Sequence, residues 1–495
     1  MISIRDLSYR FPGRTVEALR EINLEIAPGE FVVVSGPSGC GKSTLALALT
    51  GALFRQYDGE ARGTVHVDGL DTRACPLYDV ADVVGLVQQN PESQFCTLTV
   101  QDEVAFGLEN RRMPPAEMAP RIAWALQIVG AAHLVDRPLA ALSGGEKQKV
   151  AIAAVMAAKP KVLVFDEPTS NLDPSATAEI FDTIAHIRAK AAITVIVIEH
   201  KLHHLLRFGP RLVRMAAGRI VADGAAQAAD GASPWAGRPA APRPVPGGPP
   251  LVQVEGLHVG HNGRPVLRDL SVQIHSGEFV AVMGDNGTGK STFLLALLGL
   301  LKPAQGRVAV AGQDTRRTPA SRLARQTAFV FQNPDHQLFA DSVWGEAAFA
   351  PRNLGLLDAG TTQWLRDALA RGGLAGREEE HPHRLSYGEK RRLNMVSVLG
   401  TRPRLLLLDE ILIGQDPANA ALLMDMVAAE VQQGGAAVMV THDPDVVRAY
   451  ASRVLFFDGG AIAIDAPPAD AFPALAAAGR RPYLPVDWPA EEAPR

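Results

Sequence analysis

The sequence predicts an α/β protein in which one domain occurs twice. The first observation is repetition: five polar residues of the first half recur in the same order, at nearly constant separation, as the pairs Lys42 and Lys290, Gln89 and Gln332, Ser143 and Ser386, Glu167 and Glu410, and His200 and His442. The second is that short apolar runs end in glycine-rich loops or in acidic residues, as buried parallel strands do. The third is the helix-length segments between those runs. Together they indicate a duplicated domain and not a short-period repeat.

Length and composition are those of a soluble, multi-domain protein. The 495 residues suggest two or three domains, and 47% hydrophobic with 21% charged residues is ordinary for a globular chain. The net charge of −4 is spread along the sequence and gives no reason to expect a nucleic-acid partner. Cys40, Cys75 and Cys96 are too few and too scattered for a disulfide scaffold or a zinc ribbon, so a reducing, cytosolic compartment is expected.

No segment has the pattern of a secretion signal or of a membrane span. The N-terminal sequence MISIRDLSYRF carries early charges and has no apolar centre. The longest apolar run, TFLLALLGLL from Thr292, has about half the length that a bilayer crossing requires. Any membrane function is therefore expected to come from another chain.

The expected domain organisation has four parts. Residues 1–228 and 251–470 form the two copies. Residues 229–250 belong to a stretch rich in Pro, Ala and Gly, GAAQAADGASPWAGRPAAPRPVPGGPP, which cannot support a core and is expected to be a linker. The tail 471–495 is similar in composition and is expected to be loosely ordered.

Each copy contains two short apolar runs that are expected to be strands. EFVVVSG at 30–36 and EFVAVMG at 278–284 lead into glycine-rich loops, while KVLVFDE at 161–167 and RLLLLDE at 404–410 end in acidic residues. Such buried runs favour a parallel sheet with helices on its faces. The stretches 90–160 and 333–403 are more helical in pattern and are expected to form a helical subdomain in each copy.

A phosphate-binding loop follows the first of these strands in each copy. GPSGCGKST and GDNGTGKST both satisfy G-x-x-x-x-G-K-[ST], in which backbone N–H groups surround phosphate oxygens and a lysine supplies a fixed cation. A chance glycine-rich turn is the alternative, but two matches at equivalent places argue against it. The expected nucleotide-binding residues are Gly36, Pro37, Ser38, Gly39, Cys40, Gly41, Lys42, Ser43 and Thr44, and Gly284, Asp285, Asn286, Gly287, Thr288, Gly289, Lys290, Ser291 and Thr292.

The acidic strand ends predict a magnesium site and a general base. Asp166 and Asp409 end apolar strands, where a carboxylate can reach a metal ion that also contacts the hydroxyl of Ser43 or Ser291. The next residues, Glu167 and Glu410, can polarise the attacking water.

A histidine follows a β-branched run in each copy. His200 after TVIVIE and His442 after AVMVT are expected to contact the γ-phosphate, although a lone histidine in such a place is more often structural. His203 and His204 extend the first run to EHKLHH, which has metal-ligand spacing but no matching cluster, and metal binding there is disfavoured.

At this point the residues resemble the ATP-binding cassette (ABC) ATPases, over nearly the whole chain in two copies. LSGGEKQ at 142–148 is similar to the family's signature, with Ser143, Gly144 and Gly145, and the second copy keeps Ser386 and Gly388. The resemblance implies two P-loop NTPase (ABC nucleotide-binding) domains that hydrolyse ATP with Mg²⁺. It also places Gln89 and Gln332 at the Q-loop, where they serve catalysis and the metal ion, and Phe11 and His261 at the adenine-stacking position.

The sequence around the Q-loops is similar to that of energy-coupling factor importers. QNPESQFCTLTVQDEVAFG at 89–107 and QNPDHQLFADSVWGEAAFA at 332–350 share Q-N-P-x-x-Q and later apolar positions. The resemblance implies two membrane partners, a transmembrane coupling (T) component and a substrate-binding (S) component, and a place at the cytoplasmic face of the membrane. The cargo would be a vitamin or metal ion. Phe95, Phe106, Phe339 and Phe349 would line grooves for the partner or, alternatively, lie in the core; the core is favoured for Phe106 and Phe349.

The resemblance also implies that the copies pair head to tail as a pseudo-dimer within one chain. Site one would join the phosphate loop of the first copy to LSYGEK at 385–390, and site two would join that of the second copy to LSGGEK at 142–147. Tyr387 replaces Gly144, which removes access to φ > 0 and adds bulk beside the ligand. Gln415 replaces Leu172 on the same side. We expect site one to turn ATP over more slowly; equal sites are the alternative.

Two other functions remain open. One is the tandem ATPase of a sugar or nucleoside ABC importer, against which the Q-N-P-x-x-Q pattern stands. The other is a soluble ABC-type factor that acts on ribosomes or DNA, for which a charged helical linker, a basic patch or CxxC pairs would be expected and are not found in the sequence. The transported substrate cannot be read from this chain.

Overall fold

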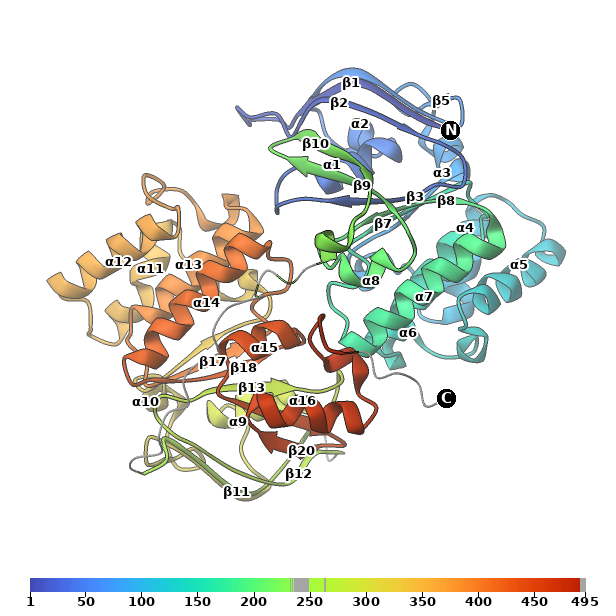
Figure 1. The fold of residues 1–495 in the computed structure, drawn as a ribbon. Coiled ribbons are helices and arrows are strands. Elements are labelled where there is room, and N and C mark those ends of the chain that lie inside the picture. The colour runs from blue at the N-terminus through green and yellow to red at the C-terminus, as the bar shows by residue number, and fades with distance from the viewer. Residues whose placement is uncertain (232, 234, 236–248, 262–263, 490–495) are drawn as a thin grey trace. The chain divides into compact units, whose positions relative to one another are not determined.

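The computed structural model describes residues 1–231, 233, 235, 249–261 and 264–489 (Figure 1). The chain divides into two compact units, Met1–Ala232 and Ser233–Arg495. The division falls inside the stretch 229–250 that the sequence analysis assigns to a linker. Each unit contains two sheets and its own helices, so each is described separately.

The main sheet of unit 1 has the strand order β10-β9-β3-β8-β7-β6. Its strands are β3 (Phe31–Ser35), β6 (Val84–Val87), β7 (Val162–Asp166), β8 (Thr194–Ile198), β9 (Arg211–Ala216) and β10 (Arg219–Ala225). Five of them run parallel, and β10 is antiparallel to β9. Every residue of β8 is buried because β-branched side chains fill both faces of the sheet. The predicted α/β fold with a parallel sheet is confirmed, with an added antiparallel edge strand.

A second, antiparallel sheet in unit 1 was not predicted from the sequence. It has the order β2-β1-β4-β5, formed by β1 (Ile2–Arg10), β2 (Leu19–Ile26), β4 (Glu60–Val67) and β5 (Leu70–Asp71). Its hydrophobic alternation is hard to recognise because the register shifts between Ile4 and Leu7, where Asp6 has a φ of 48°. The shift changes which positions along β1 face the core.

The helices of unit 1 cover the main sheet from two sides. Val32 and Val34 of β3 face one core together with the antiparallel sheet and α1, while Val33 faces another core built with α4 to α7. The helix-rich segment expected at 90–160 contains α4, α5 and α6 (Figure 1). The helices are α1 (Lys42–Leu49), α2 (Leu53–Gln56), α3 (Leu77–Val83), α4 (Val100–Asn110), α5 (Pro115–Ile128), α6 (Gly144–Met156), α7 (Pro174–Ala191) and α8 (His203–Leu206), with short 3-10 turns η1 (Pro91–Ser93), η2 (Ala132–Leu134), η3 (Leu139–Ala141) and η4 (Ala228–Gly231).

Unit 2 repeats both sheets. The main sheet has the order β16-β17-β18-β13-β19-β20 and the antiparallel sheet the order β12-β11-β14-β15. The strands are β11 (Val252–His261), β12 (Arg264–Ile274), β13 (Phe279–Met283), β14 (Gln305–Val310), β15 (Gln313–Asp314), β16 (Thr327–Val330), β17 (Leu405–Asp409), β18 (Ala436–Val440), β19 (Arg453–Asp458) and β20 (Ala461–Ala466). The duplication read from the sequence therefore extends to sheet topology.

The helices of unit 2 follow the same order until the C-terminal segment. They are α9 (Lys290–Leu297), α10 (Ala320–Leu323), α11 (Val343–Asn353), α12 (Ala359–Arg371), α13 (Tyr387–Leu399), α14 (Pro417–Gln432), α15 (Pro444–Tyr450) and α16 (Pro468–Ala477), with 3-10 turns η5 (Pro334–Gln337), η6 (Pro382–Arg384) and η7 (Arg481–Tyr483). Helix α16 and turn η7 extend unit 2 beyond its last strand.

The expectation of a loosely ordered tail over 471–495 is wrong for residues 471–489. Helix α16 continues to Ala477, and Tyr483 is completely buried in a cluster that also contains Phe472 and Leu475. The Ala- and Pro-rich composition hid this because a few well-spaced apolar side chains suffice to dock a short helix. Residues 490–495 lie outside the described part of the chain.

The first residues of the stretch expected to be a linker are anchored on either side of the division between the units. Turn η4 is tied to unit 1 by an ion pair between Arg214 and Asp230. On the other side, Trp235 is 4% exposed and packs edge-on against Tyr450 of unit 2, with ring centroids 5.6 Å apart. Residues 236–248 of the predicted linker lie outside the described residues. Within the described part of the chain, none of the helices has both the length and the apolar character that crossing a bilayer needs.

Candidate functional site

The phosphate loop of each unit lies between a central strand and the helix that follows it. In unit 1 the loop runs from Gly36, after β3, to Gly41, before α1. Gly36 has a φ of 153°, and a Cβ atom there would lie 2.1 Å from the carbonyl oxygen of Met215 in β9. The equivalent Gly284 would meet the carbonyl of Phe457 at 2.3 Å. Glycine is therefore required at this position by packing against a neighbouring strand, in addition to any approach of phosphate.

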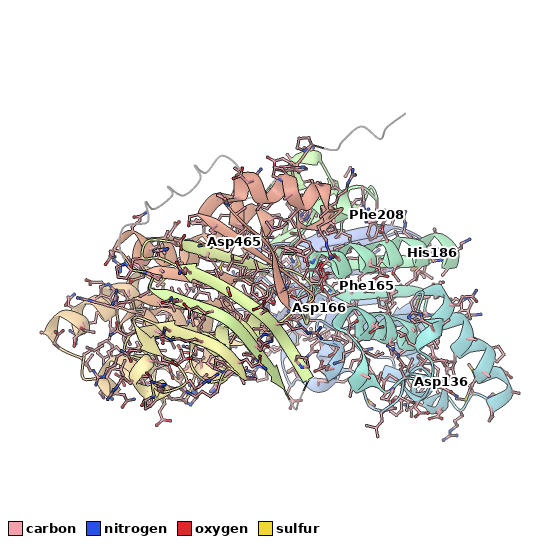
Figure 2. All side chains as sticks on the ribbon, turned by 90° about the horizontal axis from the view of Figure 1, so that it is seen from below. Asp136, Phe165, Asp166, His186, Phe208 and Asp465 are labelled. Atoms are coloured by element: carbon pink, nitrogen blue, oxygen red, sulfur yellow. The ribbon has the colours of Figure 1, made fainter. Side chains whose placement is uncertain are left out.

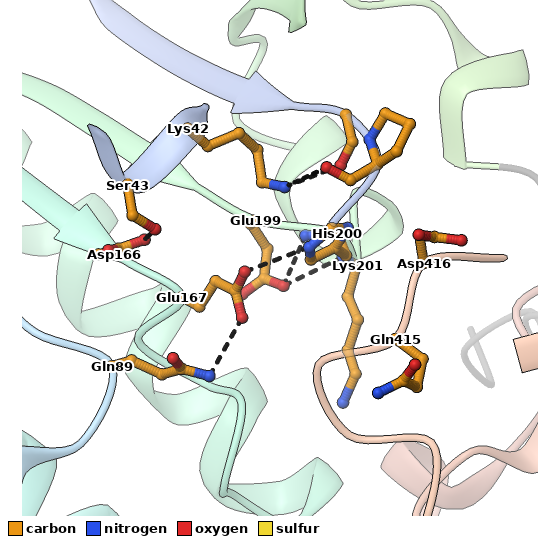
Figure 3. Close-up of polar contacts among 12 residues, drawn as sticks. Lys42, Ser43, Gln89, Asp166, Glu167, Glu199, His200, Lys201, Gln415 and Asp416 are labelled. Atoms are coloured by element: carbon orange, nitrogen blue, oxygen red, sulfur yellow. Dashed lines mark hydrogen bonds and ion pairs between the residues drawn. The ribbon is translucent and has the colours of Figure 1, made fainter. Parts of the chain in front are cut away.

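The loop lysines point back into their own loops. Lys42 Nζ donates to the carbonyl oxygens of Gly36 at 2.9 Å and Pro37 at 3.0 Å (Figure 3). Lys290 Nζ donates in the same way to Gly284 at 2.7 Å and Asp285 at 2.8 Å. Each ammonium group is thus held by two backbone carbonyl groups of its own loop. Both lysine side chains are buried. This arrangement presents a fixed cation to an anionic ligand.

A carboxylate at the end of a parallel strand faces the helix that follows the loop. The hydroxyl of Ser43 donates to Oδ1 of Asp166 at 3.1 Å. Asp166 is the last residue of β7 and follows Phe165, whose side chain is fully buried; both are labelled in Figure 2. Burial raises the pKa of Asp166 to about 6, although the Ser43 hydroxyl opposes this, and the neighbouring Glu167 adds to the rise.

The second unit has the same pair, with an unsatisfied oxygen. Burial raises the pKa of Asp409 to about 6 against a hydrogen bond from Ser291. Its Oδ1 atom is buried and has no hydrogen-bond partner among the described residues. A buried carboxylate oxygen of this kind is unfavourable unless a cation approaches it. Hydroxyl and carboxylate oxygens are the donors that Mg²⁺ prefers, so these residues fit that ion.

The next residue of each strand end is a glutamate held in a strained backbone conformation. Glu167 and Glu410 have φ values of 47° and 48°, a region that a residue other than glycine rarely adopts. Such outliers persist where the surrounding structure requires them, often in functional sites. Sequence analysis selected both residues but had no signal for this conformation.

Each of these glutamates is bound on both carboxylate oxygens. In unit 1 Gln89 Nε2 donates to Oε2 of Glu167 at 3.3 Å and His200 Nε2 lies 3.2 Å from Oε1 (Figure 3). Burial opposes the charge of Glu167, but the hydrogen bond and charge of His200, with Lys42, outweigh it and lower its pKa.

In unit 2 the same contacts form around Glu410. Gln332 Nε2 donates to its Oε2 at 3.1 Å and His442 Nε2 lies 3.0 Å from its Oε1. The structure therefore brings together, within each unit, the three residue types that the sequence analysis singled out far apart in the chain.

The histidine of unit 1 is supported by a residue that sequence analysis missed. Glu199 is 4% exposed and accepts hydrogen bonds from the hydroxyl of Thr169 at 2.8 Å and from the backbone N–H groups of His200 at 2.8 Å and Lys201 at 3.1 Å. Thr441 occupies the equivalent place in unit 2. An acidic residue at the end of an otherwise apolar strand, in TVIVIEH, was the available signal.

The signature segments begin helices α6 and α13 with matching caps. Ser143 accepts from the backbone of Glu146, whose side chain bonds back to the Ser143 N–H, and Ser386 and Glu389 repeat this capping box. The backbone N–H of Ser143 is the main reason that the pKa of Glu146 is lowered. Both helix N-termini are therefore rigid, with N–H groups directed outward.

The sequence analysis expects Tyr387 to lose a backbone conformation with φ > 0 that glycine can adopt. The structure corrects this expectation. Gly144 is the first helical residue of α6 and does not have a positive φ, so Tyr387 loses no conformation there. The constraint is space: a Cβ atom on Gly144 would lie 3.3 Å from Cδ2 of Leu172. In the second copy that leucine is Gln415. The two positions that the second copy changes are thus neighbours in unit 1.

Tyr387 also contacts the Q-loop of its own unit. Its hydroxyl lies 3.4 Å from the carbonyl oxygen of Gln332. The completely buried Arg391, one turn further along α13, donates to the carbonyls of both Phe331 and Gln332. Asn394 Nδ2 adds a bond to the carbonyl of Pro334 at 3.0 Å. Helix α13 therefore fixes the Q-loop backbone through three side chains.

These three contacts between the signature helix and the Q-loop are missing from the described residues of unit 1. The equivalent residues are Gly144, Gln148 and Ala151, and the buried Nε2 atom of Gln148 has no partner within the described residues. What the copies share is one ion pair, between Lys147 and Glu92 in unit 1. Its counterpart in unit 2 joins Lys390 to Asp335 at 2.7 Å.

Phe11 and His261 are the two candidates for stacking on adenine. Phe11 packs edge-on against Tyr9, with ring centroids 5.0 Å apart, and against Tyr57 at 5.3 Å. Tyr57 is 42% exposed, so an aromatic surface is available next to Phe11. The side chain of His261 lies outside the described part of the structure.

The expectation that Phe106 and Phe349 belong to the core is wrong. They are 38% and 40% exposed, respectively. Phe339 is 60% exposed and packs edge-on against Phe349 with centroids 4.4 Å apart. Phe95 is partly buried against the core of unit 1. The aromatic side chains that follow the Q-loops are therefore mostly at the surface.

The tandem His203 and His204 form a half-buried ring pair with centroids 3.9 Å apart. Burial lowers the pKa of His203 to about 4 and that of His204 to about 2. No group of three or more metal-binding side chains occurs among the residues that the structure describes. The pair packs against Phe181 as part of the core.

Residues 19–170 and 267–412, together more than half of the chain, match the family model described as "ABC transporter". The chain belongs to the ABC transporter family. A relative in Methanosarcina acetivorans, "Putative ABC transporter ATP-binding protein", is 34% identical over 98% of this chain and 89% of its own length. The "Putative HMP/thiamine import ATP-binding protein YkoD" of Bacillus subtilis is 32% identical over 95% of this chain and 92% of its own length. The structure of cbiO1 from Clostridium perfringens, part of the ABC transporter complex cbiONQ, aligns with a TM-score of 0.42 and 30% identity over 47% of this chain and 94% of that one.

As an ABC transporter ATP-binding protein, the chain carries two ATP-binding domains in tandem. Membership of this family implies ATP hydrolysis.

Proposed function

We propose that this chain is the ATP-hydrolysing subunit of an energy-coupling factor importer, in which hydrolysis drives uptake of a small micronutrient. The observation that carries the proposal is the complete set of loop lysine, strand-end carboxylate, glutamate, glutamine and histidine in both units, on a chain of the ABC transporter family. The name of the Bacillus subtilis relative, "Putative HMP/thiamine import ATP-binding protein YkoD", supports a vitamin as cargo. So does the Q-N-P-x-x-Q pattern after each Q-loop position.

The two ATP sites are composite. Site one consists of the phosphate loop, Asp166, Glu167 and His200 of unit 1 with the signature helix α13 of unit 2; site two reverses these parts. The capped N-terminus of α6 or α13 supplies outward N–H groups and a serine hydroxyl, which suit a γ-phosphate. Each proposed site therefore needs the phosphate loop of one copy and the signature helix of the other.

Within a site, hydrolysis is an in-line attack of water on the γ-phosphorus. The bond to the β–γ bridging oxygen breaks, and ADP and phosphate are formed. Ser43, Asp166 and Gln89, and in the other unit Ser291, Asp409 and Gln332, are the residues that would hold Mg²⁺, which neutralises phosphate charge when bound. Glu167 or Glu410 accepts the proton of the attacking water, and its lowered pKa in unit 1 keeps it ionised for that role.

The histidine and glutamine orient this base. His200 and Gln89 bind opposite oxygens of Glu167, which leaves little rotational freedom for the carboxylate. The lysines at the loop centre stabilise the negative charge that develops on the β- and γ-phosphates.

The two sites are unequal. Site one receives Tyr387, which stands where the other signature has glycine and whose hydroxyl contacts its own Q-loop. Bulk at that helix N-terminus, and not a lost backbone conformation, is the reason for slower turnover at site one. Site two receives Gly144, which leaves the helix end open to the nucleotide.

The surface after each Q-loop is the docking place for the transmembrane coupling component, which works with a substrate-binding membrane component. Phe339, Phe349 and Phe106 are exposed there, and Leu98 is 83% exposed. Apolar side chains of this size seldom remain solvated without a partner when they cluster. With such a partner, the chain would work at the cytoplasmic face of the membrane.

The test is affinity purification from detergent-solubilised membranes of the native cell. We expect recovery of a small polytopic protein, which Leu98→Glu combined with Phe339→Glu should abolish while ATP binding is retained. Val221→Glu is the matched control, because Val221 is 62% exposed on β10, which lies at the opposite edge of the main sheet from β6 and the Q-loop segment that follows it. Recovery of ribosomes, DNA or no partner at all would contradict the proposal.

A further inference from the structure

The C-terminal segment binds directly to the phosphate loop of unit 2. Asp285 is the second residue of that loop, and its Oδ1 accepts a hydrogen bond from the hydroxyl of Tyr483 at 2.7 Å. Its Oδ2 lies 3.0 Å from Nη1 of Arg480. Arg480 also contacts Asp458, at 2.6 Å. Two side chains from beyond the last strand of the main sheet thus reach one carboxylate inside the nucleotide-binding loop.

The C-terminal segment that makes these contacts is packed against unit 2 through its aromatic side chains. The Tyr483 ring is completely buried and meets Phe456 edge-on, with centroids 5.1 Å apart. The Arg480 guanidinium lies over the same ring at 5.8 Å. Further along, Trp488 packs on Phe472. The segment is therefore docked by apolar burial, which leaves the polar tips of Arg480 and Tyr483 directed at the loop.

The same loop residue is linked to the catalytic lysine through its backbone. The carbonyl oxygen of Asp285 accepts from Lys290 Nζ at 2.8 Å. The next residue, Asn286, lies 3.2 Å from Nε2 of His442 through its Oδ1. Fixing the Asp285 side chain therefore also fixes the backbone that surrounds Lys290.

Charge makes the arrangement necessary. A carboxylate within a phosphate loop repels the triphosphate that the loop binds, and the repulsion is strong over a few ångströms at a partly buried site. An arginine paired to that carboxylate cancels the charge. In unit 1 the equivalent residue is Pro37, which carries no charge, and the chain beyond that unit continues toward unit 2. The pairing thus belongs to one copy only.

We propose that Arg480 and Tyr483 are positioning residues for ATP binding at the second phosphate loop. Arg480 neutralises Asp285, and both residues hold the loop backbone around Lys290 in the shape that accepts phosphate. The C-terminal segment thereby sets the nucleotide affinity of the second loop and leaves that of the first unchanged. The inference depends on ATP binding by the loops, which the family implies, and not on the importer or the composite sites.

The test measures binding of a fluorescent ATP analogue with Mg²⁺ to the full chain. A Lys42→Ala background weakens the first loop, so that the second loop dominates the signal, and a Lys290→Ala background does the reverse. In the first background, Arg480→Gln should raise the Kd about tenfold, because it leaves the charge of Asp285 without the guanidinium that neutralises it. Tyr483→Phe, which keeps the buried ring, should raise it about threefold.

Removing the charge of Asp285 should rescue the arginine variant. We expect Asp285→Asn with Arg480→Gln to return the Kd to within about twofold of the background value, since no charge then opposes the triphosphate. Arg480→Lys, which keeps the charge, should also stay within about twofold. Asp458→Asn is the control, because it removes the other partner of Arg480 and keeps the contact with Asp285.

Three results would overturn the proposal. One is an unchanged Kd for Arg480→Gln in the Lys42→Ala background. A second is an equal rise in the Lys290→Ala background, which would mean that the segment acts on the whole chain. The third is failure of Asp285→Asn to rescue binding, which would mean that Arg480 matters only for folding of the C-terminal segment.

Discussion

The Nε2 atom of His442 lies 3.0 Å from Oε1 of Glu410. The equivalent atoms of His200 and Glu167 in the other unit are 3.2 Å apart. Both copies therefore hold the proposed general base in one orientation, and neither has lost its base or the histidine that orients it. A difference in turnover between the two proposed sites would then come from parts outside these pairs, and the signature helices, with Gly144 in one and Tyr387 in the other, are among the parts that differ.

The first prediction compares the two bases. Replacing either glutamate by glutamine removes the proton acceptor and keeps the size of the side chain. If Glu410 belongs to the site that receives Gly144, as proposed, Glu410→Gln should reduce steady-state ATPase activity about a hundredfold, whereas Glu167→Gln should reduce it about twofold. Equal losses would show that the sites are equivalent despite Tyr387.

The second prediction concerns the matched residues at the signature. Gly144→Tyr alone should impair the first signature, because the new Cβ would press on Leu172 at 3.3 Å. Leu172→Gln introduced together with it reproduces the pair found in the second copy and should recover about 1 kcal/mol of unfolding free energy. A double-mutant cycle in urea checks this; additive effects of the two changes would contradict the account.

The third prediction concerns the contacts that only unit 2 has. Arg391→Gln introduces the residue of the first copy and removes the bonds to the carbonyls of Phe331 and Gln332. Backbone amides at 331–334 should then exchange hydrogen about tenfold faster, and the ATPase rate should fall, because Gln332 is held less firmly against Glu410. Arg392→Gln is the control on the same helix: its contacts are to Gly372 and Asn419, away from the Q-loop. If both variants loosen 331–334 equally, Arg391 has no special role.

The fourth prediction is acid sensitivity of unit 1. The pKa values of His203 and His204 are lowered by burial to about 4 and about 2, from 6.5. As the pH falls, the unfolded state therefore takes up protons before the folded state does. The free energy of unfolding is then highest above pH 6.5 and decreases as the pH falls below that value. Each residue should account for a loss of about 1 kcal/mol at pH 5.5.

Hydrogen exchange of the β8 amides in the full chain, at pH 7.5 and 5.5 and corrected for intrinsic rates, measures this loss. The variant with His203→Gln and His204→Gln should show a much weaker pH dependence. His186→Gln is the control, since His186 is exposed on the outer side of α7 (Figure 2). The same pH dependence in all three proteins would assign the acid sensitivity to other groups.

Much of the fold and most of the candidate site could be predicted because their signals are local. Lys42, Ser43 and Asp166 lie in short motifs whose residue types are dictated by phosphate and metal chemistry, and the duplication showed each motif twice. The apolar run in KVLVFDE at 161–167 indicated a buried parallel strand without any knowledge of its neighbours.

The features that escaped prediction depend on contacts between distant segments. The hydrogen bonds of Glu199 to Thr169, and of Arg391 to the Q-loop, cannot be inferred from spacing, since the partners are about 30 or 60 residues apart and only the fold brings them together. Burial of Tyr483 was hidden by a composition typical of loops. The positive φ of Glu167 is set by packing around the strand end and leaves no trace in residue type.

The central claim is that nucleotide is bound between the two copies, each completing the pocket of the other. The most direct measurement is a structure of the Glu167→Gln, Glu410→Gln chain with ATP and Mg²⁺. We predict two nucleotides, with the hydroxyl of Ser386 within hydrogen-bonding distance of the γ-phosphate held by Lys42, and that of Ser143 on the γ-phosphate held by Lys290. Two bound nucleotides with both serines facing solvent would contradict the account.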